Sequence, residues 1–187
     1  MSKIDLQKLL IEYENSLCNK LFKYELSNNR TVEVVFYREQ FCHLLGLQYV
    51  YDHDKHYLGE SGYNKIKYGV ITTDALISHN RKQYNYIKDR LFYFNEIFEL
   101  MENGQLIRFY QDRAKPRTQI TAEYLIIKDK KAYTLHLFLR KENISANNNQ
   151  YAPVSFIIKS QKDDTKRQYI DRQEFKTIEK REIIDLS

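Results

Sequence analysis

Hydrophobic residues near the start of the chain recur at steps of three and four positions. The pattern runs through Leu6, Leu9, Leu10, Tyr13, Leu17, Leu21 and Tyr24. This spacing is typical of one face of an amphipathic helix, which we predict over residues 4–26. Ser2, with Asp5 three residues later, forms a candidate helix cap, and Asn28-Asn29 follows the end of the pattern.

The periodicity then changes from helical to alternating. Val32, Val34 and Phe36 fall on one face of an extended segment, which predicts a strand over residues 31–37. The segments after it are predicted as a short helical or turn segment over 38–47 closed by Gly46, a loop over 49–65 and a short helix over 66–77.

The strongest helical pattern lies in the middle of the chain. Its apolar positions are Tyr84, Ile87, Leu91, Phe94, Ile97, Phe98 and Met101. Asn103-Gly104 follows directly and is a typical helix end, so we predict a helix that stops there.

The second half of the chain alternates like strands. The predicted elements are a strand over 106–110, a hairpin of 119–127 and 132–140 through Asp129-Lys130, a polar loop over 143–150, a strand over 154–159, a charged turn over 161–167 and a last strand or helix over 168–184. Together these elements predict an α+β fold in which N-terminal helices pack on a curved antiparallel sheet of about four to five strands. We expect one domain over residues 1–187, with 1–104 mainly helical with one strand and 105–187 mainly antiparallel strands.

Composition is that of a globular chain. The 187 residues are 42% hydrophobic and 29% charged, and only 5 Gly and 2 Pro are present, so no flexible linker divides them. The sequence shows no 18-residue apolar run and no signal-peptide core. Cys18 and Cys42 are isolated, which favours a reducing compartment, the cytoplasm, and excludes a structural zinc site built on cysteines.

Charge and aromatic content add a modest preference for nucleic acid. The net charge is +5, and the chain has 16 Tyr and 10 Phe but no Trp. Basic residues attract phosphates, and aromatic faces stack on unpaired bases. AT-rich genomes also encode basic, tyrosine-rich chains, so composition alone does not decide the question.

Two strands carry polar faces that could form a site. On the strand 133–140 one face is Tyr133, Leu135, Leu137 and Leu139, and the other is Thr134, His136, Phe138 and Arg140. Histidine can transfer protons near neutral pH and arginine can hold a phosphate. Ser155 and Lys159 on the next strand would join them if the strands pair. The alternative is an ordinary solvent-facing surface for both strands.

For several other candidate residues the sequence leaves open whether their role is structural or functional. His43 lies among apolar residues and is either a partly buried structural histidine or a functional one at a helix end. His53 and His56 could ligate a metal or be merely solvated, and Lys88 on the long helix is expected in solvent. The basic loop with Arg113, Lys115 and Arg117 contacts phosphates or only improves solubility.

Several enzyme classes lack their signature. The chain contains no GxxxxGK[ST], GxGxxG, GxSxG or HExxH sequence. Nucleotide hydrolysis at a P-loop, dinucleotide redox chemistry, serine esterase and zinc protease activities are therefore not supported.

The order of several short motifs resembles a known group of proteins. The motifs are Phe41-Cys42-His43-Leu44-Leu45-Gly46-Leu47 after a strand, Lys88-Asp89-Arg90-Leu91 on a helix, Ala122-Glu123-Tyr124-Leu125, Leu135-His136-Leu137-Phe138-Leu139, Pro153-Val154-Ser155-Phe156, and a late Tyr169 with Gln173. Over roughly residues 30–178 the chain resembles phage-type nucleases of the barnase–EndoU–colicin–RelE (BECR) fold, which are common on mobile elements of Gram-positive bacteria.

The resemblance implies a helical front followed by a curved antiparallel sheet that holds RNA, and an endoribonuclease that needs no metal or other cofactor. It implies His43, Arg90, Ser155, Tyr169 and Gln173 as matched positions. The first four of these positions, together with His136, give the expected catalytic residues His43, Arg90, His136, Ser155 and Tyr169. The expected nucleic-acid-binding residues are Arg140, Lys159, Arg113, Arg117 and Gln173.

We therefore expect a phage or mobile-element endoribonuclease, or an RNA-binding protein of the nuclease fold. In the catalytic case the 2′-OH attacks the adjacent phosphorus while a base and an acid move protons. RNA is the expected partner, a protein inhibitor or host factor is a second one, and no membrane partner is expected. The alternatives are a non-catalytic interaction protein, such as an antitoxin or anti-defence factor, and a DNA-binding accessory protein.

Overall fold

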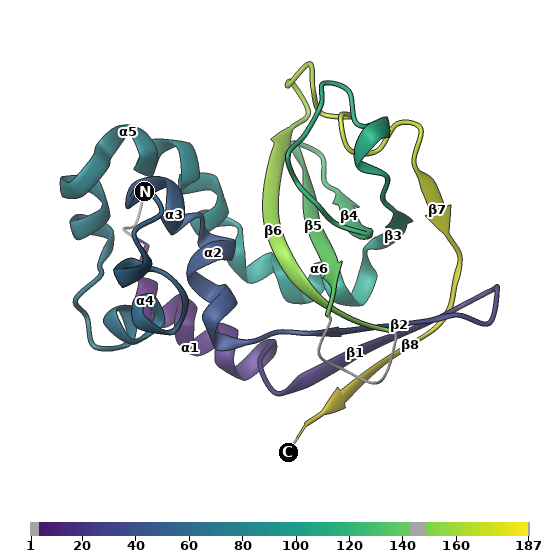
Figure 1. The fold of residues 1–187 in the computed structure, drawn as a ribbon, viewed down its shortest axis with the longest axis horizontal. Helices are drawn as coiled ribbons and strands as arrows, with labels where there is room; N and C mark the ends of the chain where they lie inside the picture. The colour runs from purple at the N-terminus through teal and green to yellow at the C-terminus, as the bar shows by residue number, and fades with distance from the viewer. Residues whose placement is uncertain (1–3, 143–148, 187) are drawn as a thin grey trace. The chain divides into compact units, whose positions relative to one another are not determined.

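The computed structural model describes residues 4–142 and 149–186, and the chain forms two compact units (Figure 1). The helical unit comprises residues 1–18 and 36–96, and the sheet unit comprises residues 19–35 and 97–187. Ser2 and most of the predicted loop over 143–150 lie outside the described residues. The single domain expected over 1–187 stays a prediction, because a compact unit need not be an independently folding domain.

The helical unit is built around a cluster of aromatic rings. Its elements are α1 (Leu6–Ser16), η1 (Arg38–Gln40), α2 (Phe41–Leu45), α3 (Leu47–Val50), η2 (Lys55–Tyr57), α4 (Gly59–Lys67), α5 (Thr73–Phe92) and η3 (Phe94–Glu96). The Phe41 ring lies 5.0 Å from that of Tyr13 and 5.3 Å from that of Phe94. These contacts join α1, α2 and η3 in one core.

The structure corrects four sequence predictions for the first 104 residues, three of them for helices and one for a loop. The helix predicted over 4–26 ends at Ser16, because Asn19 adopts a left-handed backbone conformation and residues 20–26 are a strand. The loop predicted over 49–65 contains η2 and most of α4. The helix predicted over 66–77 is instead the end of α4 and the start of α5. The long helix is interrupted after Phe92 and resumes as α6, Ile97–Asn103, where the predicted end is confirmed.

In its described residues, the sheet unit contains one sheet of eight strands. They are β1 (Lys20–Leu26), β2 (Thr31–Val35), β3 (Gln105–Arg108), β4 (Tyr124–Asp129), β5 (Tyr133–Lys141), β6 (Gln150–Ser160), β7 (Glu174–Lys176) and β8 (Ile178–Asp185), with η4 (Gln111–Arg113) after β3. Their order is β7-β3-β4-β5-β6-β2-β1-β8, antiparallel except for β2 beside β6. The α+β class is confirmed, but the expected four to five strands are too few.

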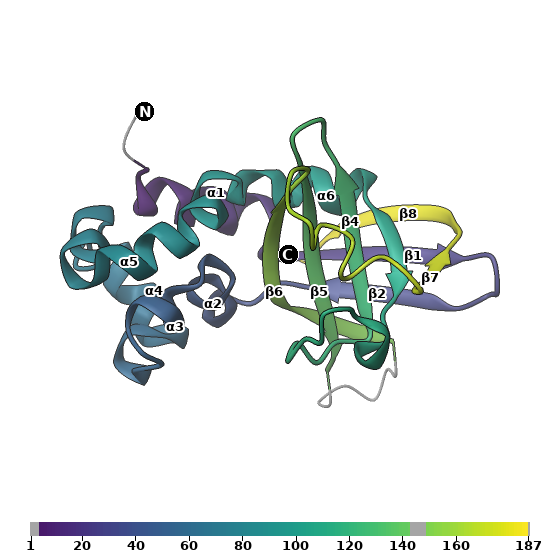
Figure 2. The ribbon, with the colours of Figure 1, turned by 90° about the horizontal axis from the view of Figure 1, so that it is seen from above.

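The sheet is nearly closed because one stretch of chain supplies both of its edges (Figure 2). β7 pairs with β3, and β8, which begins two residues after β7 ends, pairs with β1. The last segment was predicted as a strand or a helix, and it is two strands. The predicted hairpin is confirmed as β4 and β5, although β4 begins at Tyr124 rather than at residue 119. The predicted antiparallel neighbour of the hairpin is β6.

The sheet buries side chains on both faces. On one face, which we call the α6 face, Leu106, Ile126, Leu137 and Phe156 are cross-strand neighbours. α6 approaches this face so closely that a Cβ on Gly104 would lie 2.5 Å from Ile126 Cγ2, which only glycine avoids. On the opposite face, which we call the loop face, a second core gathers Ile107, Phe109, Leu125, Ile127, Phe138, Tyr169 and Ile170.

Arg181 on β8 satisfies the C-terminal carbonyl groups of α6. Its guanidinium donates to the carbonyl oxygen of Met101 over 3.3 Å and also to those of Glu102 and Gly104. We expect Arg181→Ala to lower the free energy of unfolding by about 1–2 kcal/mol, because these acceptors lose a cationic donor. Lys180→Ala, which removes a neighbouring exposed charge, should lower it clearly less. Urea unfolding of both variants tests this, and equal losses would contradict it.

Candidate functional site

A polar pocket lies at one end of the sheet, within the sheet unit. It has a volume of about 420 Å³ and is lined by Arg30, Thr31, Arg108, Glu123, Tyr124, Lys141, Asn149 and Tyr151. We call it the sheet-end pocket. Its residues come from the β1–β2 turn and from the ends of β2, β3, β4, β5 and β6. The chain thus brings together side chains that are more than 100 residues apart in sequence.

The sheet register explains why four of these side chains share one surface. Arg108, the last residue of β3, is the cross-strand partner of Tyr124, the first residue of β4. Lys141 at the end of β5 is the partner of Tyr151 on β6. Cross-strand partners point to the same side of a sheet, and alternation places all four on the α6 face. The row therefore extends across β3, β4, β5 and β6.

The pocket combines three cationic side chains with one carboxylate. Arg30 is exposed, and Arg108, Lys141 and Glu123 are partly buried. Glu123 Oε2 accepts a hydrogen bond from the backbone N–H of Lys141 over 2.8 Å. Its own backbone N–H donates to the carbonyl oxygen of Leu139 over 2.9 Å. These bonds hold the carboxylate at a fixed position beside the cations.

Two buried tyrosines form the apolar part of the pocket. The rings of Tyr124 and Tyr151 meet edge to face at 5.0 Å, and the guanidinium carbon of Arg108 lies 5.0 Å from the Tyr124 ring centre. Burial raises the pKa of Tyr151, and nearby Tyr124 and Glu123 raise it further, while Arg108 and Arg30 oppose them. The Tyr151 phenol is therefore protonated at neutral pH and can donate a hydrogen bond or a proton.

His136 lies on the loop face, and the expectation that its face of β5 is open to solvent is wrong. Its ring is fully buried, and Thr134 on the same face is buried too. The Tyr169 ring lies edge to face against it at 5.6 Å. Within the described residues neither ring nitrogen has a hydrogen bond of good geometry. Burial lowers the pKa of His136 to about 4, although the nearby backbone of Ile157 and Thr134 opposes this shift. The imidazole is therefore neutral at pH 7 and shielded from a large substrate.

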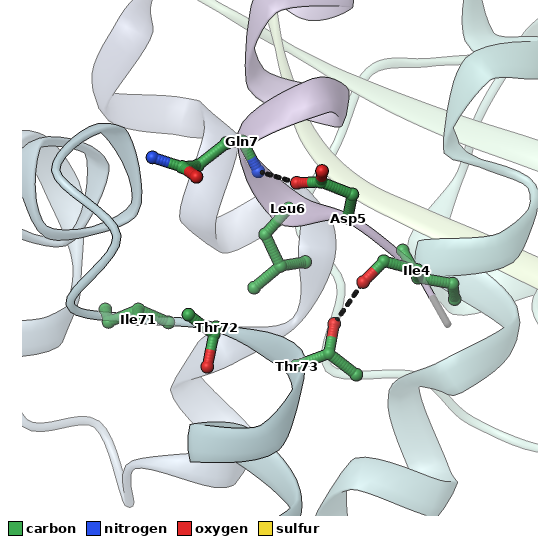
Figure 3. Close-up of a pocket in the computed structure, with 7 residues that line it drawn as sticks. All are labelled: Ile4, Asp5, Leu6, Gln7, Ile71, Thr72 and Thr73. Atoms are coloured by element: carbon green, nitrogen blue, oxygen red, sulfur yellow. Dashed lines mark hydrogen bonds between the residues drawn. The ribbon is translucent and has the colours of Figure 1, made fainter. Parts of the chain in front are cut away.

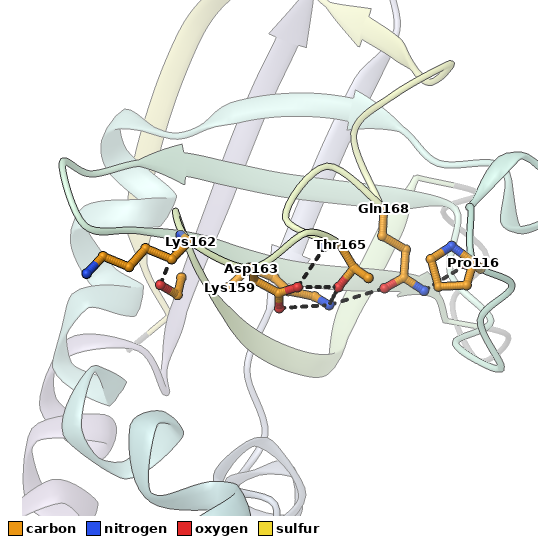
Figure 4. Close-up of polar contacts among 7 residues, drawn as sticks. Pro116, Lys159, Lys162, Asp163, Thr165 and Gln168 are labelled. Atoms are coloured by element: carbon orange, nitrogen blue, oxygen red, sulfur yellow. Dashed lines mark hydrogen bonds and ion pairs between the residues drawn. The ribbon is translucent and has the colours of Figure 1, made fainter.

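Lys159 and Tyr169 anchor the segment 161–173 on the loop face, and Figure 4 shows the polar contacts of Lys159. The Lys159 ammonium donates to Thr165 Oγ1 over 2.6 Å and lies 3.6 Å from Asp163 Oδ2. It also donates to Gln168 Oε1 over 3.2 Å. Tyr169 is 7% exposed and packs its ring on Phe138 at 5.0 Å. The Lys159 ammonium is therefore engaged within the fold, and the Tyr169 ring is packed against the core.

The remaining candidates of the sheet unit are scattered over its surface. Ser155, which faces the same side as His136, is half-buried beside Phe138. Gln173 exchanges two hydrogen bonds with the backbone of Tyr110, of 2.8 and 3.1 Å. Arg113 covers the Tyr110 ring at 3.9 Å. Arg117 and Arg140 are exposed, so their predicted contact with nucleic acid stays a prediction.

The helical unit holds the other two predicted catalytic residues. His43 on α2 is exposed, so the partial burial expected of a structural histidine is wrong, and its catalytic role stays a prediction. Arg90 on α5 is 7% exposed, and its side chain packs beside Gly46, which follows α2. Gly46 has φ +86°, and a Cβ there would lie 2.9 Å from Ile87 Cγ2, so glycine is required at this turn.

The helical unit also contains a pocket of about 320 Å³ between the starts of α1 and α5 (Figure 3). Thr73 Oγ1 donates to the carbonyl oxygen of Ile4 over 2.6 Å across it. The Asp5 carboxylate already accepts from the first free N–H groups of α1. A pocket whose charged side chain is an aspartate suits a phosphate poorly, so we do not assign the site to it.

Residues 4–142 and 149–186 contain neither a candidate metal cluster nor a membrane-spanning helix. Within these ranges no three His, Cys, Asp or Glu side chains gather where they could hold a metal ion, and His53 and His56 are exposed. No helix in the same ranges is long and apolar enough to cross a lipid bilayer.

The sequence alone did not single out Arg30, Arg108, Glu123, Tyr124, Lys141 or Tyr151 as functional residues. Glu123-Tyr124 lies within a motif of the resemblance, but the sequence pattern predicts one strand over 119–127 and so places this pair inside the strand rather than at its start. Correct strand boundaries would have shown that these residues lie at the ends of strands. In consecutive antiparallel strands, the last residues of one strand and the first residues of the next lie at the same end of the sheet.

One comparison with known proteins gave a match, and it covers nearly the whole chain. A family model described as phage-Barnase-EndoU-ColicinE5/D-RelE like nuclease 4, abbreviated PBECR4, matches residues 5–186. A search of curated proteins gave no match. A search of solved structures gave none either.

Proposed function

The chain belongs to the PBECR4 family of phage-type nucleases, and from this premise we propose that it cleaves single-stranded RNA at the sheet-end pocket. The observation that carries the proposal is the joint presence of Glu123, three cations and a protonated tyrosine in one pocket. A carboxylate can accept a proton, cations can bind a phosphate, and a phenol can return a proton. These are the groups that phosphodiester cleavage by an internal nucleophile requires.

The proposed reaction proceeds by attack of the ribose 2′-OH. Glu123 accepts the 2′-OH proton as O2′ forms a bond to phosphorus, and the bond from phosphorus to O5′ breaks. Tyr151 donates its proton to the departing O5′. Arg108, Lys141 and Arg30 stabilise the additional negative charge on the phosphoryl oxygens. The products are a 2′,3′-cyclic phosphate and a 5′-hydroxyl end.

The charge of the pocket supports a reaction that proceeds without a divalent metal. Arg30, Arg108 and Lys141 contribute three positive charges against the single negative charge of Glu123. Such a site attracts a phosphate and repels Mg²⁺, whose usual protein ligands are carboxylates. The cations themselves occupy the role that a metal ion has in other nucleases.

We expect the purified protein to cleave unstructured RNA in the presence of EDTA. The products should carry 2′,3′-cyclic phosphate ends, which acid treatment opens and mass spectrometry detects. A DNA oligonucleotide of the same sequence should stay intact, because it lacks the 2′-OH nucleophile. Intact RNA after prolonged incubation of the folded protein, both with and without divalent metal ions, would contradict the proposal and leave a binding role instead.

The same cleavage assay distinguishes an active site at the sheet-end pocket from one at the catalytic residues that the sequence predicts. His43→Ala and His136→Ala remove the two histidines among the predicted catalytic residues. If the sheet-end pocket is the active site, His43→Ala should retain activity within a few fold. A loss in His43→Ala as large as that expected for removal of a general base would place the reaction in the helical unit instead.

A further inference from the structure

Arg90 is a nearly buried cation that has no counterion in the part of the chain that the structure describes. It is 7% exposed, and no residue within 4–142 and 149–186 forms a hydrogen bond or an ion pair with its guanidinium. Its partner in these ranges is the ring of Tyr49, whose centre lies 5.2 Å from the guanidinium carbon. A buried charge is costly unless it is paired, so a residue of this kind indicates an anionic ligand.

Two further aromatic side chains pack against the Tyr49 ring on the helical unit. The Tyr49 ring meets the Tyr86 ring at 5.3 Å and 80°, and the His53 ring at 6.2 Å and 72°. Tyr86 is 63% exposed, and His53 is also exposed. Tyr86 and Arg90 are four residues apart on α5, so they lie on the same face of the helix. We call Tyr49, His53, Tyr86 and Arg90 the Tyr49 cluster.

We propose that the Tyr49 cluster is a second binding site of the protein, which takes one unpaired nucleotide of a single-stranded RNA. The base stacks on the exposed ring of Tyr86, and the phosphate pairs with Arg90. This inference rests on the proposed function, since it assumes that RNA is the substrate, but it uses none of the residues of the sheet-end pocket.

The chemistry of the cluster favours a nucleotide over an acidic peptide. A peptide carboxylate would pair with Arg90 but would leave the exposed ring of Tyr86 unused. A nucleotide offers an anion and a flat π-system at adjacent positions, which matches a cation beside aromatic rings. Lys82 lies one helical turn before Tyr86 on α5 and is exposed, so it can contact the next phosphate.

The test is the affinity of the full-length protein for a fluorescently labelled single-stranded RNA whose 2′-hydroxyls are methylated, so that it cannot be cleaved. We expect Tyr86→Ala to weaken binding by about 5- to 100-fold, the range seen when one stacked base loses its aromatic partner. Arg90→Gln should also weaken binding and reduce the dependence of affinity on salt by about one phosphate contact. Tyr68→Ala removes a 76% exposed tyrosine of the same unit and should leave affinity within twofold.

The affinities of these variants for RNA decide whether the Tyr49 cluster binds a nucleotide. If Tyr86→Ala binds within twofold of the unchanged protein, or if Tyr68→Ala loses as much affinity, the Tyr49 cluster is not a nucleotide site. A weaker affinity for an acidic peptide than for RNA is expected, and the reverse order overturns the choice of ligand. If the proposed function fails, an RNA with free 2′-hydroxyls stays intact in the cleavage assay. The weaker RNA binding of Tyr86→Ala would still be observed in that case.

Discussion

Replacing Glu123 by glutamine is expected to lower the rate constant of RNA cleavage by about 10²–10⁴-fold, the usual contribution of a general base. Glutamine has the same shape, and its side-chain oxygen can still accept the hydrogen bond from the Lys141 backbone that Glu123 accepts. The fold should therefore be retained, and the variant should lose the ability to take up the 2′-OH proton. Single-turnover kinetics at saturating protein measures this step without contribution from binding.

The matched control is Glu179→Gln, an isosteric change at an exposed position of β8 in the same unit. It removes the same charge away from the pocket and should alter the rate less than about threefold. A second comparison is Tyr151→Phe, which removes the proposed proton donor and leaves the ring contact with Tyr124. If Glu123→Gln and Glu179→Gln cleave at equal rates, Glu123 is not the base.

Acid is expected to destabilise the protein through His136 by about 3 kcal/mol between pH 6.5 and pH 4. Burial lowers the pKa of this histidine from 6.5 to about 4 in the folded protein. The unfolded chain therefore binds a proton over a pH range in which the folded protein does not. The contribution of His136 to stability is complete above pH 6.5 and is lost as the pH falls toward 4.

The prediction is tested by urea unfolding at pH 7 and at pH 4.5 with and without His136→Leu. The variant lacks the titrating group and should lose clearly less stability on acidification than the unchanged protein. His56→Leu, which removes an exposed histidine, should show the original pH dependence. Several carboxylates with lowered pKa values also act at low pH, so the difference between variants is the informative quantity. An unchanged dependence in His136→Leu contradicts the burial argument.

Elements with a single uniform periodicity were predictable from the sequence. The alternation of residues 132–140 and 154–159 gave two neighbouring strands, and Asn103-Gly104 marked the end of a helix, as the structure confirms. The first helix was extended too far because Leu21 and Tyr24 continue its spacing by coincidence. Residues 20–26 also alternate, with Phe22, Tyr24 and Leu26 buried, and pairing on both sides with β2 and β8 decides in favour of a strand.

The candidate site was harder to predict because its geometry depends on non-local pairing. The alternation of β5 was recognised, but both of its faces are buried, and the face with His136 is covered by segments that showed no regular pattern in sequence. The polar residues on this face of β5 therefore did not show that the face is exposed to solvent. The residues of the sheet-end pocket are ordinary in their local context, and only the register of four strands shows that Arg108, Tyr124, Lys141 and Tyr151 share one face.

The manner in which β7 and β8 close the sheet has a consequence for how the protein folds. β1 and β3 emerge from the ribosome long before residues 174–185, yet each finds one of its two neighbours only in that segment. Until then both strands present unpaired N–H and C=O groups, which are templates for association with other chains. Folding of the sheet must also wait for contacts between residues as far apart as 165 positions, which are slow to form. The nascent chain is therefore most exposed to aggregation during the interval between synthesis of β1 and synthesis of β8, when a chaperone would protect it best.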